Sequence, residues 1–174
     1  MREFLIYFIS SLIAYYLVYA IYTLVIGPFF IPSVKVKVKL IPGGKLPVFK
    51  TLGAVCADAY AHLEKSVVIE HGERATIPLG FAMGLPTDYE LQVRPRSGWS
   101  RDGVDVTLGT GDYDFIGEYT ATICNNSHKP LTIADGDRVC QIGVRQVPRL
   151  RMKLVKVLKK TERGENGWGS TGRR

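Results

Sequence analysis

The sequence has few of the residues that build disulfide frameworks and protein-ligated metal sites. Its 174 residues include only three cysteines and three histidines. The cysteines form no CxxC pair, and their odd number argues against a disulfide framework. We therefore interpret Cys56, Cys124 and Cys140 as small buried side chains in a reducing compartment. The histidines are scattered and form no HExxH motif, so they are expected to be structural or surface residues.

A P-loop is also absent, because no GKS or GKT sequence occurs in a strand–loop–helix context. The formal net charge of +7 lies almost entirely after the first thirty residues. A basic balance of this kind fits nucleic acid, anionic lipid or an anionic small substrate, and equally a solvated basic surface. The motifs below favour the small substrate, and no nucleic-acid partner is expected.

Charge is missing from the stretch between Phe4 and Ile31, which is otherwise apolar but contains five tyrosines. A helix needs about 20 residues to cross ~30 Å of hydrocarbon, so this stretch is long enough. Lysines follow it, at positions 35, 37, 39 and 45, whereas Arg2 alone precedes it. The positive-inside rule then predicts a single-pass anchor in residues 1–33, with the remaining chain tethered to the cytoplasmic face of a membrane. The alternative is that this segment is not in the mature protein, because of processing or because the start of the sequence is mis-set.

Short strand-like pieces separated by glycine and proline fill residues 34–160. They are predicted at Val34–Leu40, Ser66–Glu70, Arg74–Leu79, Tyr89–Val93, Glu118–Cys124, Leu131–Ile133, Val139–Val147 and Arg151–Leu158. The last piece also has the spacing of an amphipathic helix, and no other helix is expected after the N-terminus. About ten short strands at this spacing predict an all-β sandwich or jelly roll. Residues 161–174 are rich in glycine and are predicted to form a flexible C-terminal arm.

Four places carry residues suited to phosphate chemistry. Arg96-Ser97-Gly98 combines a guanidinium fork, a hydroxyl donor and a flexible amide, which is what a polyphosphate requires. Gly109 to Phe115 forms a glycine-punctuated acidic turn, in which a carboxylate can orient water. Asp58 lies among small residues and is either a turn former or a site acid. In the arm, Trp168 and the Gly169-Ser170-Thr171-Gly172 run suit a phosphorylated, aromatic-faced ligand.

Five stretches in fixed order resemble the motifs of the trimeric dUTPase family (dUTP diphosphatases). They are Ala57-Asp58-Ala59-Tyr60-Ala61, Pro95-Arg96-Ser97-Gly98, Gly109 to Glu118, Gly136-Asp137-Arg138-Val139-Cys140-Gln141 and Arg163 to Gly172. The resemblance covers the chain from about Lys35 to its end. It implies a jelly roll of β-clip type and a homotrimer with three active sites at subunit interfaces. It also implies Mg²⁺-assisted hydrolysis of dUTP to dUMP and pyrophosphate, which lowers dUTP and supplies dUMP for dTMP synthesis.

The resemblance also implies a role for each matching residue. Asp112 would activate the water that attacks the α-phosphorus in line, and Asp58 would reach the magnesium ion through a water ligand. Phosphates would be held by Arg96, Ser97, Gly98, Arg163, Ser170 and Thr171. Gln141 would hydrogen-bond phosphate or the water network, and Gly169 would also belong to the substrate-binding residues. The backbone of Gly109, Thr110 and Gly111 would read the uracil, while Trp168 would cover its face and Phe115 would stack on the deoxyribose.

The third motif departs from the family pattern at two places. Thr110-Gly111 replaces the usual Val-Ile or Leu-Ile, and this glycine is expected to loosen the hairpin that reads the base. Phe115 replaces a tyrosine and keeps its stacking ring. Two alternative functions stay open on the same fold. One is a dCTP deaminase or bifunctional deaminase-diphosphatase with Glu118 as the base, and the other is a non-catalytic regulatory binding protein.

Overall fold

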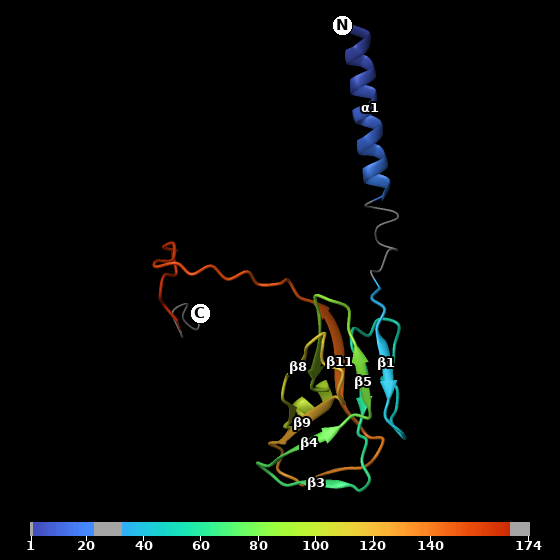
Figure 1. Cartoon of the computed structure of the whole chain (residues 1–174), viewed down its shortest axis with the longest axis vertical. Coiled ribbons are helices and arrows are strands. Elements are labelled where there is room, and N and C mark those ends of the chain that lie inside the picture. The colour runs from blue at the N-terminus through green and yellow to red at the C-terminus, as the bar shows by residue number, and fades with distance from the viewer. Residues whose placement is uncertain (1, 23–32, 168–174) are drawn as a thin grey trace.

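The structure, a computed structural model, describes residues 2–22 and 33–167. One long helix precedes a mostly β domain, and both that helix and the described segment after the last strand extend away from the domain (Figure 1). The elements are α1 (Arg2–Ile21), β1 (Lys37–Leu40), β2 (Ala57–Tyr60), β3 (Val67–Ile69), β4 (Arg74–Pro78), β5 (Phe81–Gly84), β6 (Tyr89–Arg94), α2 (Ser97–Arg101), β7 (Val104–Val106), β8 (Gly109–Gly111), β9 (Thr120–Asn125), β10 (Leu131–Ile133) and β11 (Arg138–Gln146).

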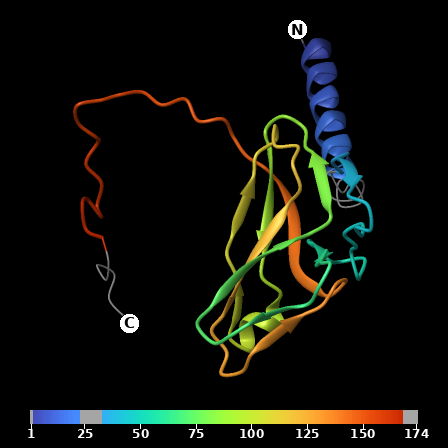
Figure 2. The same cartoon turned by 60° about the horizontal axis from the view of Figure 1, so that its bottom comes forward.

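The strands pair only in antiparallel fashion in the described part of the chain. A four-stranded sheet has the order β2-β11-β6-β8, and a three-stranded sheet has the order β4-β9-β7. Two further pairs, β1-β5 and β3-β10, complete the domain. Figure 2 shows these strands wrapped around a common interior, with the long β11 running through the domain. The four-stranded sheet brings together residues from β2, β6 and β11 that are distant in sequence.

Alternating burial explains why the strands pack as they do. Along β9, Ala121, Ile123 and Asn125 face inward, while the residues between them are exposed or half-buried. The interior side chains include Phe81, Leu91 and Val139, each fully buried. Their burial supplies the apolar contact that holds a domain of this size together. The described part of the chain therefore has one contiguous core, at the centre of the strands.

Most of the predicted strands are present, although their ends differ by a few residues. Arg151–Leu158 is an exception, because it forms neither a strand nor a helix: residues 148–167 are exposed, and Leu154 is fully so. Its apolar spacing has no partner surface among the described residues. The prediction of no second helix is also wrong, since Ser97–Arg101 forms the short helix α2. Strands β2, β5, β7 and β8 were not predicted.

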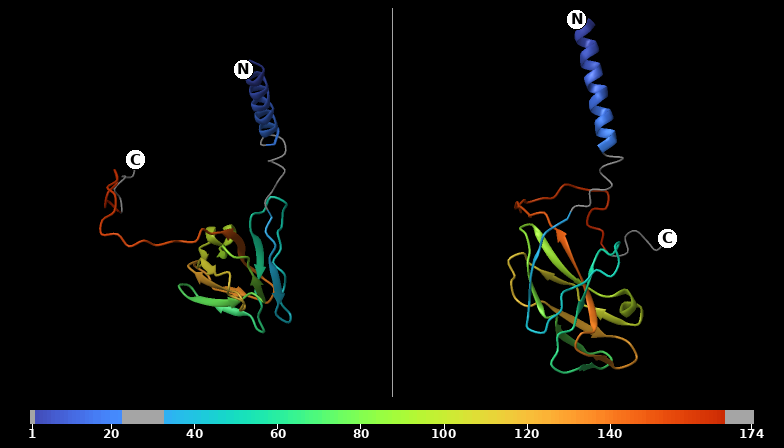
Figure 3. Two further views of the ribbon diagram at one scale, coloured as in Figure 1. Left: turned by 45° about the horizontal axis from the view of Figure 1, so that its top comes forward. Right: turned by 90° about the vertical axis from the view of Figure 1, so that its right-hand side faces the viewer.

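The N-terminal stretch does form a helix, but the prediction of a membrane anchor is not supported. Within residues 2–22 and 33–167, no helix is long and apolar enough to cross a membrane. α1 ends at Ile21, well before the end of the apolar stretch in which the anchor was predicted. Residues 23–32 lie outside the described part of the chain. The two views in Figure 3 show α1 set apart from the strands.

Candidate active site

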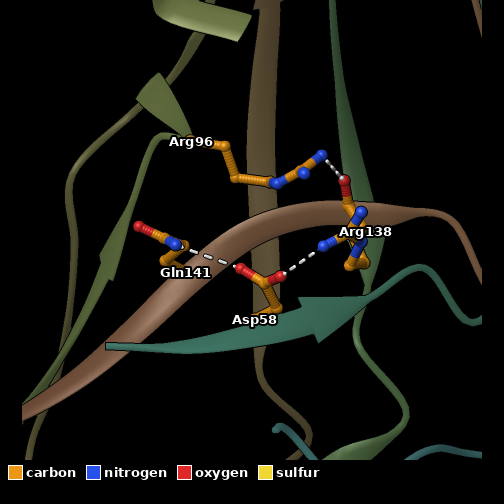
Figure 4. Close-up of polar contacts among 4 residues, drawn as sticks. All are labelled: Asp58, Arg96, Arg138 and Gln141. Carbon is orange, nitrogen blue, oxygen red and sulfur yellow. Dashed lines mark hydrogen bonds and ion pairs between the residues drawn. The ribbon is translucent and has the colours of Figure 1, made fainter. Parts of the chain in front are cut away.

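Asp58 lies at the centre of a polar cluster formed by β2 and β11 (Figure 4). Its Oδ1 accepts a hydrogen bond from Gln141 Nε2 at 3.0 Å, and its Oδ2 accepts one from Arg138 Nη1 at 2.9 Å. The Arg96 guanidinium joins the cluster, because its Nη1 donates to the carbonyl oxygen of Arg138 at 2.8 Å. Asp58 is only 4% exposed, so this is a buried carboxylate held by one amide and one cation.

Strand register explains this cluster. Asp58 of β2 is the direct antiparallel partner of Gln141 in β11, and Gln141 is also the partner of Arg94 in β6. Arg96 and the start of α2 follow directly after β6. Side chains opposite each other on neighbouring strands lie close enough to interact. The sheet order therefore brings the first, second and fourth motifs to one place.

The charge of Asp58 is stabilised despite its burial. Burial alone would raise the pKa of the Asp58 carboxyl. Hydrogen bonds from Gln141 and Arg138, together with the positive charges of Arg96 and Arg138, outweigh that effect and lower the pKa below its usual value. Asp58 is therefore an anion at neutral pH, which rules out a role as a proton donor there.

A cavity of about 280 Å³ opens beside this cluster. Its lining residues are Lys50, Thr51, Ala54, Cys56, Asp58, Arg96, Ser97, Gly98, Arg138 and Gln141. Three of them carry a positive charge and one a negative charge, so the lining is cationic overall. The Ser97 hydroxyl and the Gly98 backbone add small polar groups at the start of α2. This combination suits an anion that carries several oxygen atoms.

A second cavity, of about 270 Å³, lies beside β8. It is lined by Val93, Gly109, Thr110, Gly111, Asp112, Phe115, Glu118, Tyr119 and Thr120. The two cavities share no lining residue in the described chain. A single chain therefore does not bring Asp112 together with Asp58.

The expected loosening of the hairpin at Gly111 is not observed. Gly111 is buried and pairs with Leu91 in β6. The ring of Tyr119 packs against it: a Cβ atom added at Gly111 would lie 2.6 Å from the Tyr119 hydroxyl oxygen and 2.9 Å from Cζ. The aromatic side chain thus occupies the space that a side chain at position 111 would need.

Comparison with known proteins shows the family to which the chain belongs. A family model described as dUTPase matches residues 45–172. A deoxyuridine 5'-triphosphate nucleotidohydrolase of Bdellovibrio bacteriovorus is 43% identical over 133 residues, which cover 75% of this chain and 89% of that protein. The chain belongs to the dUTPase family.

Solved dUTPase structures agree on the fold. A dUTPase of Staphylococcus bacteriophage 80alpha with dUpNHpp has a TM-score of 0.73 at 21% identity, and the match covers 80% of this chain and 99% of that one. A D-to-N mutant dUTPase from phage phi11 of S. aureus, which coordinates a structural Mg(II) ion, has a TM-score of 0.66 at 19% identity; that match covers 72% of this chain and 99% of that one. At these identities the likeness establishes the architecture alone.

Not all residues implied by the family resemblance are near the two cavities. Arg163 lies on the exposed C-terminal segment, which runs away from the strands (Figures 1 and 2). Its Nε and Nη2 donate to the carbonyl oxygens of Asn166 and Gly167, so its described contacts are within the arm itself. Trp168, Gly169, Ser170 and Thr171 lie outside the described residues.

Two residues with clear contacts to the site were not singled out from the sequence. Arg138 is the cationic partner of Asp58, and its place within the fourth dUTPase motif was the available signal. Tyr119 lines the Asp112 cavity but follows the third motif, so no motif pointed to it.

Glu118, the base that a deaminase would need, has a structural contact. Its Oε1 accepts a hydrogen bond from the backbone N–H of Gly80 at 2.9 Å. Gly80 adopts a positive φ of 70°, so this bond fixes a turn that needs glycine. One oxygen of Glu118 is therefore committed to the fold, which weakens the deaminase alternative.

Proposed function

We propose that the protein hydrolyses dUTP to dUMP and pyrophosphate. The observation that carries this proposal is the cationic cavity around Asp58, to which three dUTPase motifs contribute residues. Membership of the family supplies the substrate, because the relatives are deoxyuridine 5'-triphosphate nucleotidohydrolases. The jelly roll of β-clip type that the family implies accords with the antiparallel sheets described above.

The triphosphate would bind beside α2. Arg96 would offer its free guanidinium nitrogens to phosphate oxygens, while its Nη1 stays on the Arg138 carbonyl. Ser97 and Gly98 would donate a hydroxyl and an amide proton. Gln141 holds Asp58 through Nε2, which leaves its own amide oxygen free to accept from a water molecule. These groups position the substrate, and positioning with charge stabilisation is the main protein contribution in phosphoryl transfer.

The donor set fits a magnesium ion that is bound mainly by the substrate. Among residues 2–22 and 33–167, no group of three or more side chains forms a metal cage. Asp58 is the one carboxylate among the described residues that line the phosphate cavity, and both of its oxygens already accept hydrogen bonds. Such a carboxylate suits contact through a water ligand, and Mg²⁺ usually keeps several waters and binds substrate phosphates. When bound, the ion would neutralise the charge that develops on the phosphates.

Asp112 is the proposed general base. It lies directly after β8, at the mouth of the second cavity, and its side chain is exposed. An exposed carboxylate at this place can accept a proton from a water molecule positioned in line with the α-phosphorus. The backbone of Gly109, Thr110 and Gly111 would read the uracil, and Phe115 would stack on the deoxyribose.

The separation of the two cavities supports a site shared between subunits. A triphosphate held near Asp58 of one chain needs Asp112 from elsewhere, because the two cavities of one chain have no lining residue in common. We propose a homotrimer in which each site combines the Asp58 cavity of one chain with the Asp112 hairpin of another. The arm of residues 161–174 would close that site, with Arg163 on the γ-phosphate and Trp168 over the base. Gly169, Ser170 and Thr171 would add donors to the phosphates.

A pyrophosphate-release assay over dUTP, dCTP, dTTP and UTP tests this function with the full chain. We expect rapid release from dUTP with Mg²⁺ and little from the other three. Ammonia measured in the same samples separates a deaminase from a diphosphatase. Release of ammonia from dCTP, or equal rates on all four nucleotides, would contradict the proposal. Binding of dUTP without turnover would favour the regulatory alternative.

A further inference from the structure

The hydroxyl group of Tyr119 has no hydrogen-bond partner, although it is buried. Within the described part of the chain, it is the single buried side-chain nitrogen or oxygen atom without one. The whole residue is only 5% exposed. Burying a hydroxyl without a partner is costly, and such groups in native proteins need an explanation. A partner that forms only in the working complex would provide one.

The ring of Tyr119 is held firmly in place. It stacks on Phe81 with ring centroids 5.6 Å apart, and the edge of Phe115 meets it at 5.2 Å. Gly111 lies against the hydroxyl end and leaves no room for a side chain there. Three neighbours therefore fix where the hydroxyl lies, next to the backbone that leads into Asp112.

Charge links this hydroxyl to Asp112. Burial raises the pKa of the Tyr119 phenol, and the negative charge of Asp112 raises it further. The phenol is thus a protonated donor across the neutral range, and the Asp112 carboxylate is an acceptor in the same cavity. The other carboxyl group lining this cavity belongs to Glu118, whose Oε1 already accepts from Gly80.

We infer that Tyr119 is a positioning residue for the general base. When nucleotide fills the cavity, the Tyr119 hydroxyl donates a hydrogen bond to the Asp112 carboxylate and fixes its orientation toward the attacking water. Hydrogen bonds of catalytic groups are often missing or long without substrate and tighten in the complex, in agreement with the free hydroxyl seen here. This inference rests on the proposed role of Asp112 in dUTP hydrolysis.

The variant Tyr119→Phe removes the hydroxyl and keeps the ring against Phe81, Phe115 and Gly111. We expect kcat on dUTP to fall about 10- to 100-fold, the range for a hydrogen bond to a charged group, with KM nearly unchanged. The acid limb of the kcat–pH profile should move to higher pH, because a carboxylate that loses a donor is protonated more easily. The Tm should stay equal or rise, since no partner is lost in the free protein.

Tyr113→Phe serves as the matched control. It removes a phenol next to Asp112 in the sequence, but that side chain is 43% exposed and lies under the Arg149 guanidinium. We expect kcat and the pH profile of this variant to match those of the unmodified protein. A raised KM with unchanged kcat in Tyr119→Phe would place the hydroxyl on the nucleoside and overturn the inference. An unchanged pH profile, or a lower Tm, would overturn it as well.

A readout without turnover separates this inference from the proposed function. The hydroxyl proton of Tyr119 is followed by proton NMR in the presence of a non-hydrolysable imido analogue of dUTP. We expect a downfield, slowly exchanging hydroxyl signal that is lost in Asp112→Ala, and the same signal in both proteins would refute the inference. Failure of the unmodified protein to hydrolyse dUTP would instead refute the proposed function, whatever the hydroxyl signal shows.

Discussion

Substitution of Gly111 by alanine tests whether Tyr119 fills the space behind the hairpin. The added Cβ would lie 2.6 Å from the hydroxyl oxygen and 2.9 Å from Cζ of Tyr119, well inside contact distance. The ring has little freedom to move, because Phe81 and Phe115 pack on it. Overpacking of a filled core costs about 1–3 kcal/mol, so we expect the free energy of unfolding to fall by this amount.

Urea unfolding at one protein concentration measures the effect, since the stability of an oligomer depends on concentration. The midpoint should fall with the m-value unchanged. Gly109→Ala is the matched control on the same strand, because a Cβ there would meet Val93 at 3.5 Å, an ordinary contact distance. Its stability should stay within about 0.5 kcal/mol of the unmodified protein.

A double-mutant cycle then assigns the cost to Tyr119. In a Tyr119→Leu background the ring is gone, so Gly111→Ala should cost little or nothing. The coupling free energy between the two positions should then be about 1–3 kcal/mol, within the range for residues in direct contact. The reasoning is refuted if Gly111→Ala is as stable as the unmodified protein, or if it costs the same amount with and without Tyr119.

Three further predictions concern the proposed chemistry. Asp112→Ala should lower dUTP hydrolysis at least about 100-fold, the usual contribution of a general base, with an unchanged elution volume in size-exclusion chromatography; near-normal turnover would exclude this base. Asp58→Asn should cost about 1–3 kcal/mol of unfolding free energy at pH 7. The pKa of Asp58 is lowered in the folded state, so the stability difference between the unmodified protein and Asp58→Asn should be full above pH ~4. It should shrink as the pH falls through the folded-state pKa. An equal stability difference at pH 3 and pH 7 would contradict this linkage. Removal of Arg163–Arg174 should lower kcat/KM at least about tenfold, since charge-assisted hydrogen bonds to phosphate would be lost. The Tm should change little, because the described arm residues are exposed. A large fall in Tm would show that the arm supports the fold.

The alternation of buried and exposed residues allows some strands to be predicted from the sequence, whereas other strands lack this pattern. β9 alternates between buried and less buried residues, and the middle of β11 does so from Cys140 to Gly143, so period-two patterning predicts these strands. β5 reads Phe-Ala-Met-Gly and is buried at three successive positions, so it has no alternating pattern to detect. β8 is a Gly-Thr-Gly segment with little β propensity, and its pairing with β6 holds it in place. Both segments are therefore strands because of their contacts with the rest of the domain, not because of their local sequence.

The candidate site can be predicted only in part from the sequence, because its geometry depends on the register in which the strands pair. Composition alone does not decide whether Asp58 forms a turn or acts as a site acid. Its partner Gln141 lies 83 residues later, and only the pairing of β2 with β11 places the two side chains together. The role of Arg138 follows from the same register, since its guanidinium reaches Oδ2 of the same carboxylate. No local spacing rule links residues so distant in sequence.

The third motif shows why a comparison of single positions with the family pattern predicts a loosened hairpin that the structure does not have. A glycine in place of a branched residue suggests lost volume when position 111 is considered alone. In the structure the volume is supplied by Tyr119, which reaches back across the turn to the same space. Glycine at position 111 and the aromatic residue at position 119 therefore fit together, because a side chain at 111 beside Tyr119 would overpack this space and the absence of both would leave a cavity, and each costs stability. The exchange also places a hydroxyl on a residue that lines the same cavity as Asp112, which an aliphatic residue at position 111 would not supply, so the pair would change the chemistry around the proposed base as well as its packing.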